Sequence, residues 1–175
     1  VASITLADQQ IATLVVTATA GGVLVNGVLL NQGGTATAYD NASLRLRVAA
    51  DTTANGRVTL ADAAVNLVTQ ASPSVGGYVV VPAGLSALSL KVDGAAVTLP
   101  GTTATAGNDL TLMVYGDAAA AQAVFFTDEN TPPTATGKSK LRLVHGVNGL
   151  ASAISLDIDF STAASNVAYG RSSAY

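Results

Sequence analysis

The 175-residue sequence contains no cysteine and no tryptophan, and it has a single histidine and a single methionine. Without cysteine the chain can form neither disulfides nor thiolate metal sites. The absence does not fix the cellular compartment, because many secreted bacterial proteins also lack cysteine.

Charge is also scarce. Only 11% of the residues are charged, against about 25% in an ordinary soluble domain. The eight basic residues are scattered and the net charge is −3, so the basic stripe that nucleic-acid binding requires is missing, as is a polybasic membrane patch. The longest apolar run, residues 21–30, is too short for a membrane span of roughly 20 residues.

A chain that is 49% hydrophobic and poor in charge must stay in solution through hydroxyl and backbone groups. This composition suits a secreted protein that lies outside the cell or on its surface, packed against copies of itself, although an ordinary threonine-rich β protein would share it. The sequence starts at Val1 and shows no leader pattern, so we expect a processed chain or a segment of a longer one.

Alternating apolar and polar residues predict antiparallel strands. In residues 43–50, Leu44, Leu46 and Val48 fall on one face, and arginines fall on the other. Similar runs are RVTLAD, ALSLKVDG, LTLMVYG, KLRLVHG and ISLDIDF. Turn signals separate them, and Asp93-Gly94 is the best hairpin candidate.

Two local stretches need separate predictions. The alanine-rich residues 61–71 and 117–123 could form short helical turns, but the short strand spacing around them favours strand or loop. In ISLDIDF we expect Asp157 and Asp159 on the solvent face, with Leu156, Ile158 and Phe160 pointing inward.

The sequence repeats itself. Tyr78 and Tyr175 are 97 residues apart, and the same offset places Leu44-Arg45-Leu46 on Leu141-Arg142-Leu143. A second match, at an offset of 99, places residues 6–18 on 105–117 and 21–37 on 120–136. Repeats of this length indicate a tandem array of similar units.

The repeats predict an all-β fold of tandem antiparallel Ig-like β-sandwiches, one complete and two partial. Residues 1–34 would be the closing strands of one sandwich, 43–130 a complete sandwich, and 139–175 the opening strands of a further one. The connecting stretches QGGTATAYDNA and DENTPPTATGK are polar linkers.

A partial sandwich cannot bury its apolar face alone, and its open strand edges invite pairing with another chain. We therefore expect residues 1–34 of one copy to complete residues 139–175 of the next, head to tail. The expected donor side chains are Ile11, Leu14, Val16, Val23, Val25, Val28 and Leu30. The expected acceptor side chains are Leu141, Leu143, Ile154, Leu156, Ile158 and Tyr175.

The joined unit would lack the counterpart of residues 79–99. Either the joint is a reduced sandwich, or the polypeptide is longer than these residues; both alternatives stay open.

These motifs resemble a family of bacterial extracytoplasmic domains known only as a domain of unknown function. Its VRVVHA-like opening strand is similar to KLRLVHGVNG, and its later motifs are similar to AYGRSSAY (168–175), SVGGYVVVPAG (74–84), SLKVDG (89–94) and AGNDLTLMVYG (106–116). The resemblance covers nearly the whole chain and implies tandem Ig-like sandwiches on secreted proteins or lipoproteins, with no catalytic residues to transfer. The first repeat departs from the pattern, with Val48-Ala49 where the second has His145-Gly146.

Catalytic and metal signals are weak. His145 lacks the partners of a Ser-His-Asp triad in the sequence, and its absence from the first repeat favours a structural strand-end role. Asp157 and Asp159 are too few for a calcium site. Asp128-Glu129-Asn130 is interpreted as the start of a polar linker. We expect no catalytic residue, no metal and no cofactor.

The remaining candidates are aromatic or modifiable residues. Tyr78, Tyr115, Tyr169 and Tyr175 are expected to pack in the core or at strand corners, with their hydroxyls reaching backbone groups; a sugar-binding platform is the unsupported alternative. Asn41 begins a formal glycosylation sequon, Asn-Ala-Ser.

The sequence therefore predicts a structural subunit of an extracellular filament, sheath or surface assembly, with copies of itself as partners. The alternative is a surface-attached adhesin or stalk module that recognises a glycan or a protein. An enzyme is not expected.

Overall fold

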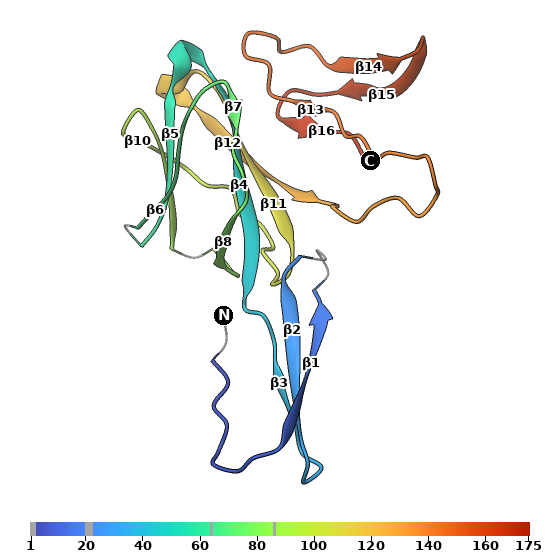
Figure 1. The fold of residues 1–175 in the computed structure, drawn as a ribbon. Helices are drawn as coiled ribbons and strands as arrows, with labels where there is room; N and C mark the ends of the chain where they lie inside the picture. The colour runs from blue at the N-terminus through green and yellow to red at the C-terminus, as the bar shows by residue number, and fades with distance from the viewer. Residues whose placement is uncertain (1–2, 20–22, 64, 86) are drawn as a thin grey trace.

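A computed structural model describes residues 3–19, 23–63, 65–85 and 87–175. It confirms the all-β, Ig-like sandwich prediction. The described residues form an N-terminal sheet, a β-sandwich and a C-terminal segment, with the N-terminal sheet and the C-terminal segment at opposite ends of the molecule (Figure 1). Residues 1, 2 and 20–22 of the expected closing strands lie outside the described residues.

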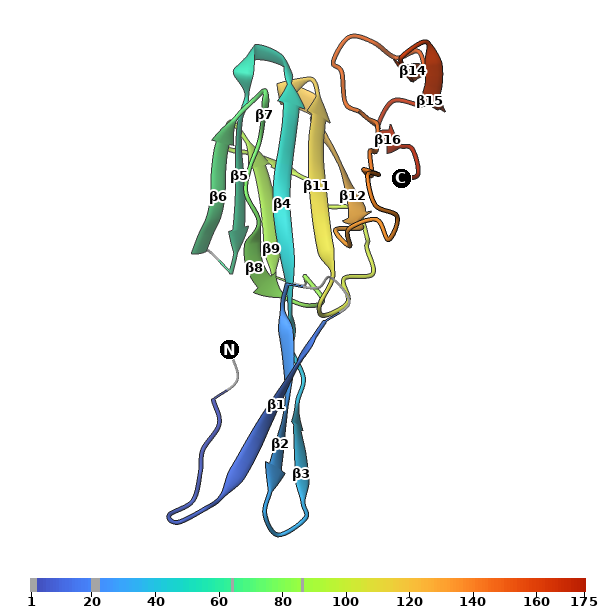
Figure 2. The same ribbon diagram turned by 45° about the vertical axis from the view of Figure 1, so that its right-hand side comes forward.

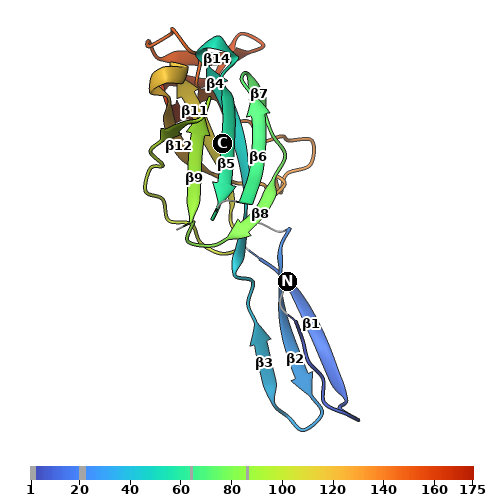
Figure 3. The same cartoon turned by 90° about the vertical axis from the view of Figure 1, so that its left-hand side faces the viewer.

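The N-terminal sheet contains β1 (Ala12–Ala18), β2 (Val25–Asn31) and β3 (Ala36–Tyr39), paired antiparallel in the order β1-β2-β3. It projects from one end of the sandwich in all three ribbon views (Figures 1, 2 and 3). Within the described residues, β1 is an edge strand, since only β2 pairs with it.

Two sheets face each other in the sandwich, as Figure 2 shows. The first has the order β10-β9-β5-β6. Its strands are β5 (Arg57–Asp62), β6 (Val65–Ala71), β9 (Leu88–Val92) and β10 (Ala95–Val97). Asp93-Gly94 forms the turn of the β9–β10 hairpin, as predicted.

The second sheet has the order β12-β11-β4-β7, and β8 also pairs with β4. Its strands are β4 (Ser43–Thr52), β7 (Ser74–Val75), β8 (Val79–Pro82), β11 (Asp109–Gly116) and β12 (Gln122–Asp128). The β4–β11 pairing is parallel and runs from Asp109 opposite Arg45 to Gly116 opposite Thr52. Short 3₁₀ turns occupy Thr53–Asn55 (η1) and Ala118–Ala120 (η2).

The core lies between these two sheets because each central strand turns alternate apolar side chains inward. Burial along β4 alternates over its whole length, so the expected inward face of residues 43–50 is confirmed. The buried core side chains are Leu44, Leu46, Val48, Ala50, Val58, Leu60, Val81, Leu90, Val92, Leu110, Leu112 and Val114.

The C-terminal segment adds β13 (Val144–His145), β14 (Ile154–Ile158), β15 (Ser161–Val167) and β16 (Arg171–Ser172). β13 pairs with β16, and β14 pairs with β15. The segment packs on the outer face of β11: a β-carbon at Gly146 would lie 2.9 Å from the Met113 sulfur, and one at Gly170 would collide with the Tyr115 hydroxyl.

Some of the local predictions are confirmed and others are wrong. Within residues 61–71, Ala61 and Asp62 end β5 and Val65–Ala71 form β6, as favoured; residues 117–123 combine η2 with the start of β12. The inward position of Phe160 is wrong: the side chain is fully exposed, because Asp159 and Phe160 adopt positive φ angles of 48° and 62° in the β14–β15 turn. Ile158 is also exposed, and Leu156 is half-buried.

No helix among the described residues is long and apolar enough to cross a bilayer.

Two valines on adjacent strands test the core assignment. Val48→Ala should lower the free energy of unfolding by about 2–3 kcal/mol, because the Val48 side chain is fully buried and its loss leaves a cavity. Val80→Ala, at a 57% exposed position on β8, should change it by less than about 0.5 kcal/mol. Urea denaturation followed by circular dichroism measures both; equal losses would contradict the assigned core.

Candidate functional site

The exposed apolar surface of the N-terminal sheet is the first candidate site. Leu14 and Val16 on β1 are 47% and 56% exposed, and Val25 and Leu30 on β2 are 56% and 41% exposed. Ile11 and Val23, which flank the strands, are also exposed, and Val28 is half-buried. All the predicted donor side chains therefore retain solvent-exposed apolar surface, on a sheet that β1 leaves open at one edge.

These side chains occupy both faces of the sheet. The register pairs Leu14 with Leu29 and Val16 with Gly27, whereas Val28 is opposite Val15 and Leu30 is opposite Thr13. Because side chains alternate along a strand, Leu14, Val16 and Val25 lie on one face, and Val28 and Leu30 lie on the other. A sheet that is apolar on both faces is typical of the central part of a larger structure.

The same strands exist in the complete sandwich. Adding 97 to each of the seven β1–β2 residue pairs, from Ala12–Asn31 to Ala18–Val25, gives the seven β11–β12 pairs, from Asp109–Asp128 to Tyr115–Gln122. The offset of 99 that sequence matching indicates is therefore wrong by two residues, and one period of 97 relates both partial units to the sandwich.

The C-terminal segment repeats the opening of the sandwich at this period. β5 begins at Arg57 and β14 at Ile154, 97 residues later; β7 spans Ser74–Val75 and β16 spans Arg171–Ser172. The counterparts of β4, β5, β6 and β7 in chain order are thus β13, β14, β15 and β16. Their pairing departs from the exact period, because Val144 lies opposite Ser172, whereas adding 97 to the Ala49–Val75 pair would place Gly146 there. Among the predicted acceptor residues, Leu141, Ile158 and Tyr175 are exposed, and Leu143, Ile154 and Leu156 are half-buried.

The outer edges of β1 and β13 are unpaired in the described residues, whereas the corresponding edges of β11 and β4 pair with each other in the sandwich. In the sandwich, β11 pairs with β12 on one side and with β4 on the other. In the described residues, β1 pairs only with β2, and β13 pairs only with β16. The described residues therefore present a β11-like strand without a β4-like partner, and a β4-like strand without a β11-like partner.

A second feature is a polar network on the outer face of β4, β11 and β12. Its members are Arg45, Arg47, Tyr78, Asp109, Thr111, Asp128, Asn130 and Arg142. Both carboxylates are almost completely buried. Asp128 comes from the stretch interpreted as a linker start, so that interpretation is wrong for Asp128, and the sequence reasoning missed the network.

Asp109 and Asp128 organise the network. Arg45 Nε donates to Asp109 Oδ1 at 2.7 Å, and Arg45 Nη2 pairs with Oδ2. The Tyr78 hydroxyl and the Thr111 hydroxyl donate to Asp128 Oδ2 at 2.6 and 2.5 Å. The sandwich therefore provides hydrogen-bond partners for both buried charges, which would otherwise be costly to bury.

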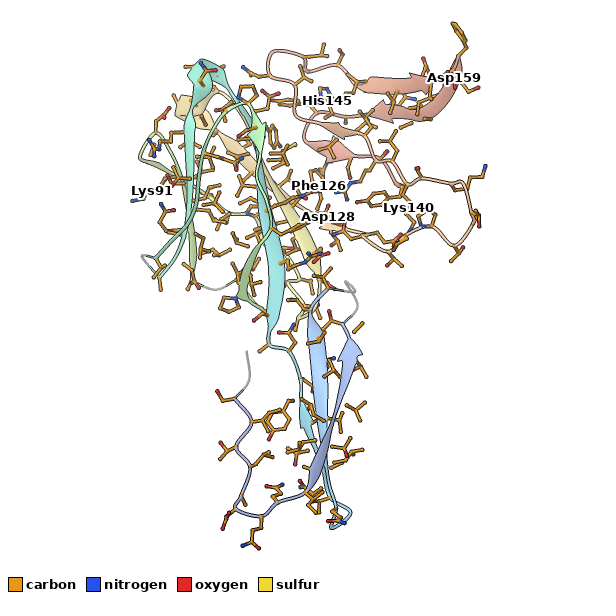
Figure 4. The ribbon with its side chains drawn as sticks, viewed as in Figure 1. Lys91, Phe126, Asp128, Lys140, His145 and Asp159 are labelled. Atoms are coloured by element: carbon orange, nitrogen blue, oxygen red, sulfur yellow. The ribbon has the colours of Figure 1, made fainter. Side chains whose placement is uncertain are left out.

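Arg142 joins the C-terminal segment to this network. Its Nη2 pairs with Asp128 Oδ1, and its Nη1 donates to the Thr127 carbonyl at 2.7 Å. Asp128 and Phe126 lie on the side of the sandwich that faces the C-terminal segment, as Figure 4 shows. The Arg142 guanidinium lies 5.6 Å from the Phe126 ring centroid, so this arginine clamps the two parts together.

The repeat extends to an arginine–tyrosine stack. Arg45 Cζ lies 4.6 Å from the Tyr78 ring centroid, and Arg142 Cζ lies 4.8 Å from that of Tyr175. Both members of the second pair follow those of the first by 97 residues. The expectation that the Tyr78 hydroxyl reaches a backbone group is wrong, because it donates to Asp128.

Burial and charge shift several pKa values. Burial alone would raise the pKa of Asp109, but hydrogen bonds from Arg45 and Asn130 outweigh it and hold this pKa below its ordinary value. Burial raises the pKa of Tyr78 to about 12, and the neighbouring Asp128 carboxylate contributes to the increase. Burial also raises the pKa of Tyr169. The network therefore favours the ionised form of Asp109 and the neutral form of Tyr78.

His145 is fully buried at the junction between the sandwich and the C-terminal segment. Its ring lies 5.4 Å from the Tyr169 ring, which packs edge-on against Tyr115 at 4.9 Å. Nε2 lies 3.0 Å from the Ser152 carbonyl oxygen. In the part of the chain that the structure describes, no carboxylate or hydroxyl hydrogen-bonds to His145, so its surroundings are those of a packed side chain.

The other sequence candidates are dispersed. Asp157 and Asp159 are exposed at the far end of the β14–β15 hairpin, where Figure 4 shows Asp159 away from the sandwich. Asn41 is half-buried, and its Oδ1 accepts a hydrogen bond from the Ser43 amide at 2.9 Å; its glycosylation stays a prediction.

Comparison with known proteins finds similarity to solved structures, but only at the level of the structure. No protein-family model matches the chain, and no curated protein matches it significantly. A solved structure of a candidate cell adhesion protein from Bacteroides uniformis aligns with a TM-score of 0.35 and 10% identity, over 73% of this chain and 69% of that chain. A likeness of this degree says nothing about what the present chain binds.

The Asp109 carboxylate should make stability pH-dependent. Its pKa is lower in the folded than in the unfolded chain, so its contribution is complete above the unfolded value and is lost as the pH falls through the folded one. Asp109→Asn should therefore lower the free energy of unfolding by about 1–3 kcal/mol at pH 7, with a smaller difference below about pH 4. Urea denaturation across this range tests it, with the exposed Asp157→Asn as the control; a pH-independent deficit would contradict it.

Removing the clamp should loosen the C-terminal segment. Arg142→Gln should speed hydrogen exchange of the β13 and β16 amides on the order of tenfold, because it removes charge-assisted hydrogen bonds to buried Asp128. Arg171→Gln changes an exposed arginine of the same segment and should have little effect. Unchanged protection in Arg142→Gln would show that other contacts hold the segment.

Proposed function

We propose that this chain is a structural subunit of an extracellular assembly, a filament or sheath, in which copies join head to tail by completing each other's partial sandwiches. The observation that carries the proposal is the open edge of β1, whose counterpart β11 is covered by β4 in the complete sandwich. The low charge of the chain and its resemblance to extracytoplasmic repeat domains support the same proposal.

Burial of apolar surface would drive the association. Val15 and Val28 are the counterparts of Leu112, which is fully buried, and Phe125, which packs against the core. Val15 is 41% exposed in the single chain. Fully burying one aliphatic side chain stabilises by about 1.5–3 kcal/mol, so covering both faces of β1 and β2 would contribute several times that amount before entropic costs.

The placement of the two open edges favours a linear polymer. The N-terminal sheet and the C-terminal segment lie at opposite ends of the molecule (Figures 1 and 2). A contact between unlike surfaces at opposite ends is heterologous, and it generates an open chain of subunits unless the rotation closes a ring.

The joined unit would be a reduced sandwich. One sheet would contain β2, β1, β13 and β16, which correspond to β12, β11, β4 and β7. The other would contain β14 and β15, which correspond to β5 and β6. Counterparts of β8, β9 and β10 would be absent at the joint unless a longer polypeptide supplies them.

The test is polymerisation of the 175-residue chain and of a variant that charges the joint. The wild-type protein should form filaments in negative-stain electron microscopy and sediment as large species. Val15→Lys should remain monomeric, because a lysine there is solvated in the free chain but buried without a partner in the joint. Val65→Lys changes a 66% exposed valine on β6 and should polymerise like the wild type.

Monomeric wild-type protein at high concentration would contradict the proposal and favour the surface-bound adhesin or stalk module. Filaments that form equally well from Val15→Lys would show that assembly uses another surface.

A further inference from the structure

The sandwich contains a template for the joint between copies. Residues of β11 and β4 pair in parallel as Asp109 with Arg45, Thr111 with Arg47, Leu112 with Val48 and Met113 with Ala49. The β1–β2 register equals the β11–β12 register shifted by 97 residues, and β13 lies 97 residues after the matching part of β4. Applied to the β4–β11 pairing, the same shift gives the residues that would face each other across a joint built on this template.

We propose that β1 of one copy pairs in parallel with Arg142–Asn148 of a second copy, with Leu14 beside Val144 and Val16 beside Gly146. The inference rests on the proposed function and deepens it, because it names the partner strand, its direction and its register. In this register Ala12 lies beside Arg142, and Ala18 lies beside Asn148.

At the proposed joint, both members of a polar pair of the sandwich have apolar counterparts. On the outer face of the sandwich, Arg47 donates to Thr111 at 2.8 Å, and Arg47 also pairs with Asp128 at 3.5 Å. The counterparts of these three residues are Val144, Leu14 and Asn31. An apolar pair thus replaces the polar Arg47–Thr111 pair, and the carboxylate that Arg47 would need is replaced by a neutral amide.

The next outward pair keeps a large residue beside a small one. Met113 lies beside Ala49 in the sandwich, and the counterparts are Val16 and Gly146. Close cross-strand packing of this kind favours one register over its neighbours.

Arg142, the arginine at the start of the proposed partner strand, already has a carboxylate partner in its own chain. Asp109, the partner of Arg45, has the uncharged counterpart Ala12. The counterpart of Arg45 is Arg142, which pairs instead with Asp128 of the preceding sandwich in its own chain. The joint can therefore form in this register without leaving a buried charge unpaired.

Disulfide trapping tests the register, because the natural chain has no cysteine. Two single-cysteine chains, Leu14→Cys and Val144→Cys, are mixed in equal amounts and oxidised under conditions where the wild type polymerises. Adjacent Cα atoms of neighbouring strands fall within the range that a disulfide spans. We expect the 14–144 disulfide-linked dimer to form on the order of tenfold more than either chain forms with itself, with the linkage identified by mass spectrometry.

Two matched mixtures control for register. Val15→Cys with Val144→Cys places the thiols on opposite faces of the strands, and Val16→Cys, at an exposed position, with Val144→Cys shifts the pairing by two residues, to about 7–8 Å. Both should yield at least fivefold less linked dimer. Circular dichroism of each chain confirms that the substitutions leave the fold unchanged.

The outcomes separate the two proposals. Filaments with equal or greater linkage in a control mixture, or with none in the 14–144 mixture, would overturn the register and leave the structural role intact. Monomers with no linkage in any mixture would overturn both. Filaments with linkage concentrated in the 14–144 mixture would support both.

Discussion

The parallel pairing of β4 with β11 is the contact on which the rest of the structure depends. It joins the opening strand of the sandwich to a strand that follows 64 residues later, as the Arg45–Asp109 pair shows, and so closes the chain into one unit. Its inward side chains, including Leu46 and Leu112, supply the centre of the core. Its outward side chains align Arg45 with Asp109 and Arg47 with Thr111, which builds the polar face on which the C-terminal segment rests.

The same pairing gives opposite characters to the two strand edges that are unpaired in the described residues. β1 is the counterpart of β11 and β13 is the counterpart of β4, yet in this part of the chain β1 pairs only with β2 and β13 pairs only with β16. Apolar side chains on β1, including Leu14 and Val16, stay exposed there. The two open edges are therefore of complementary kinds.

Strand alternation made most of the sandwich predictable, because burial in a two-sheet structure follows a period of two. Leu44, Leu46 and Val48 were assigned to the core on that basis, and the Asp93-Gly94 hairpin followed from turn chemistry. The N-terminal repeat offset could not be fixed this way: a shift of two residues keeps every side chain on its face, and in a sequence rich in alanine, threonine and valine both offsets match. Phe160 was misplaced because a positive φ interrupts the alternation. Alternation places Arg142 on the polar side of KLRLVHG, but it cannot show that Asp128, 14 residues earlier, lies beside it, so the polar network was not predicted.

Several of the chain's few charged residues are used within the polar network of the sandwich. Three of the eight basic residues, Arg45, Arg47 and Arg142, are held by Asp109 and Asp128 on one face of the sandwich. Arg142 holds the C-terminal segment against that face, so these charges pair with each other within the chain. β1 carries no charged side chain along its open edge, so like-charge repulsion would not oppose contact with another strand there and no counterion would have to be displaced. Because one edge belongs to a β11-like strand and the other to a β4-like strand, two like edges lack the complement that the sandwich template requires, and the proposed association would have a direction.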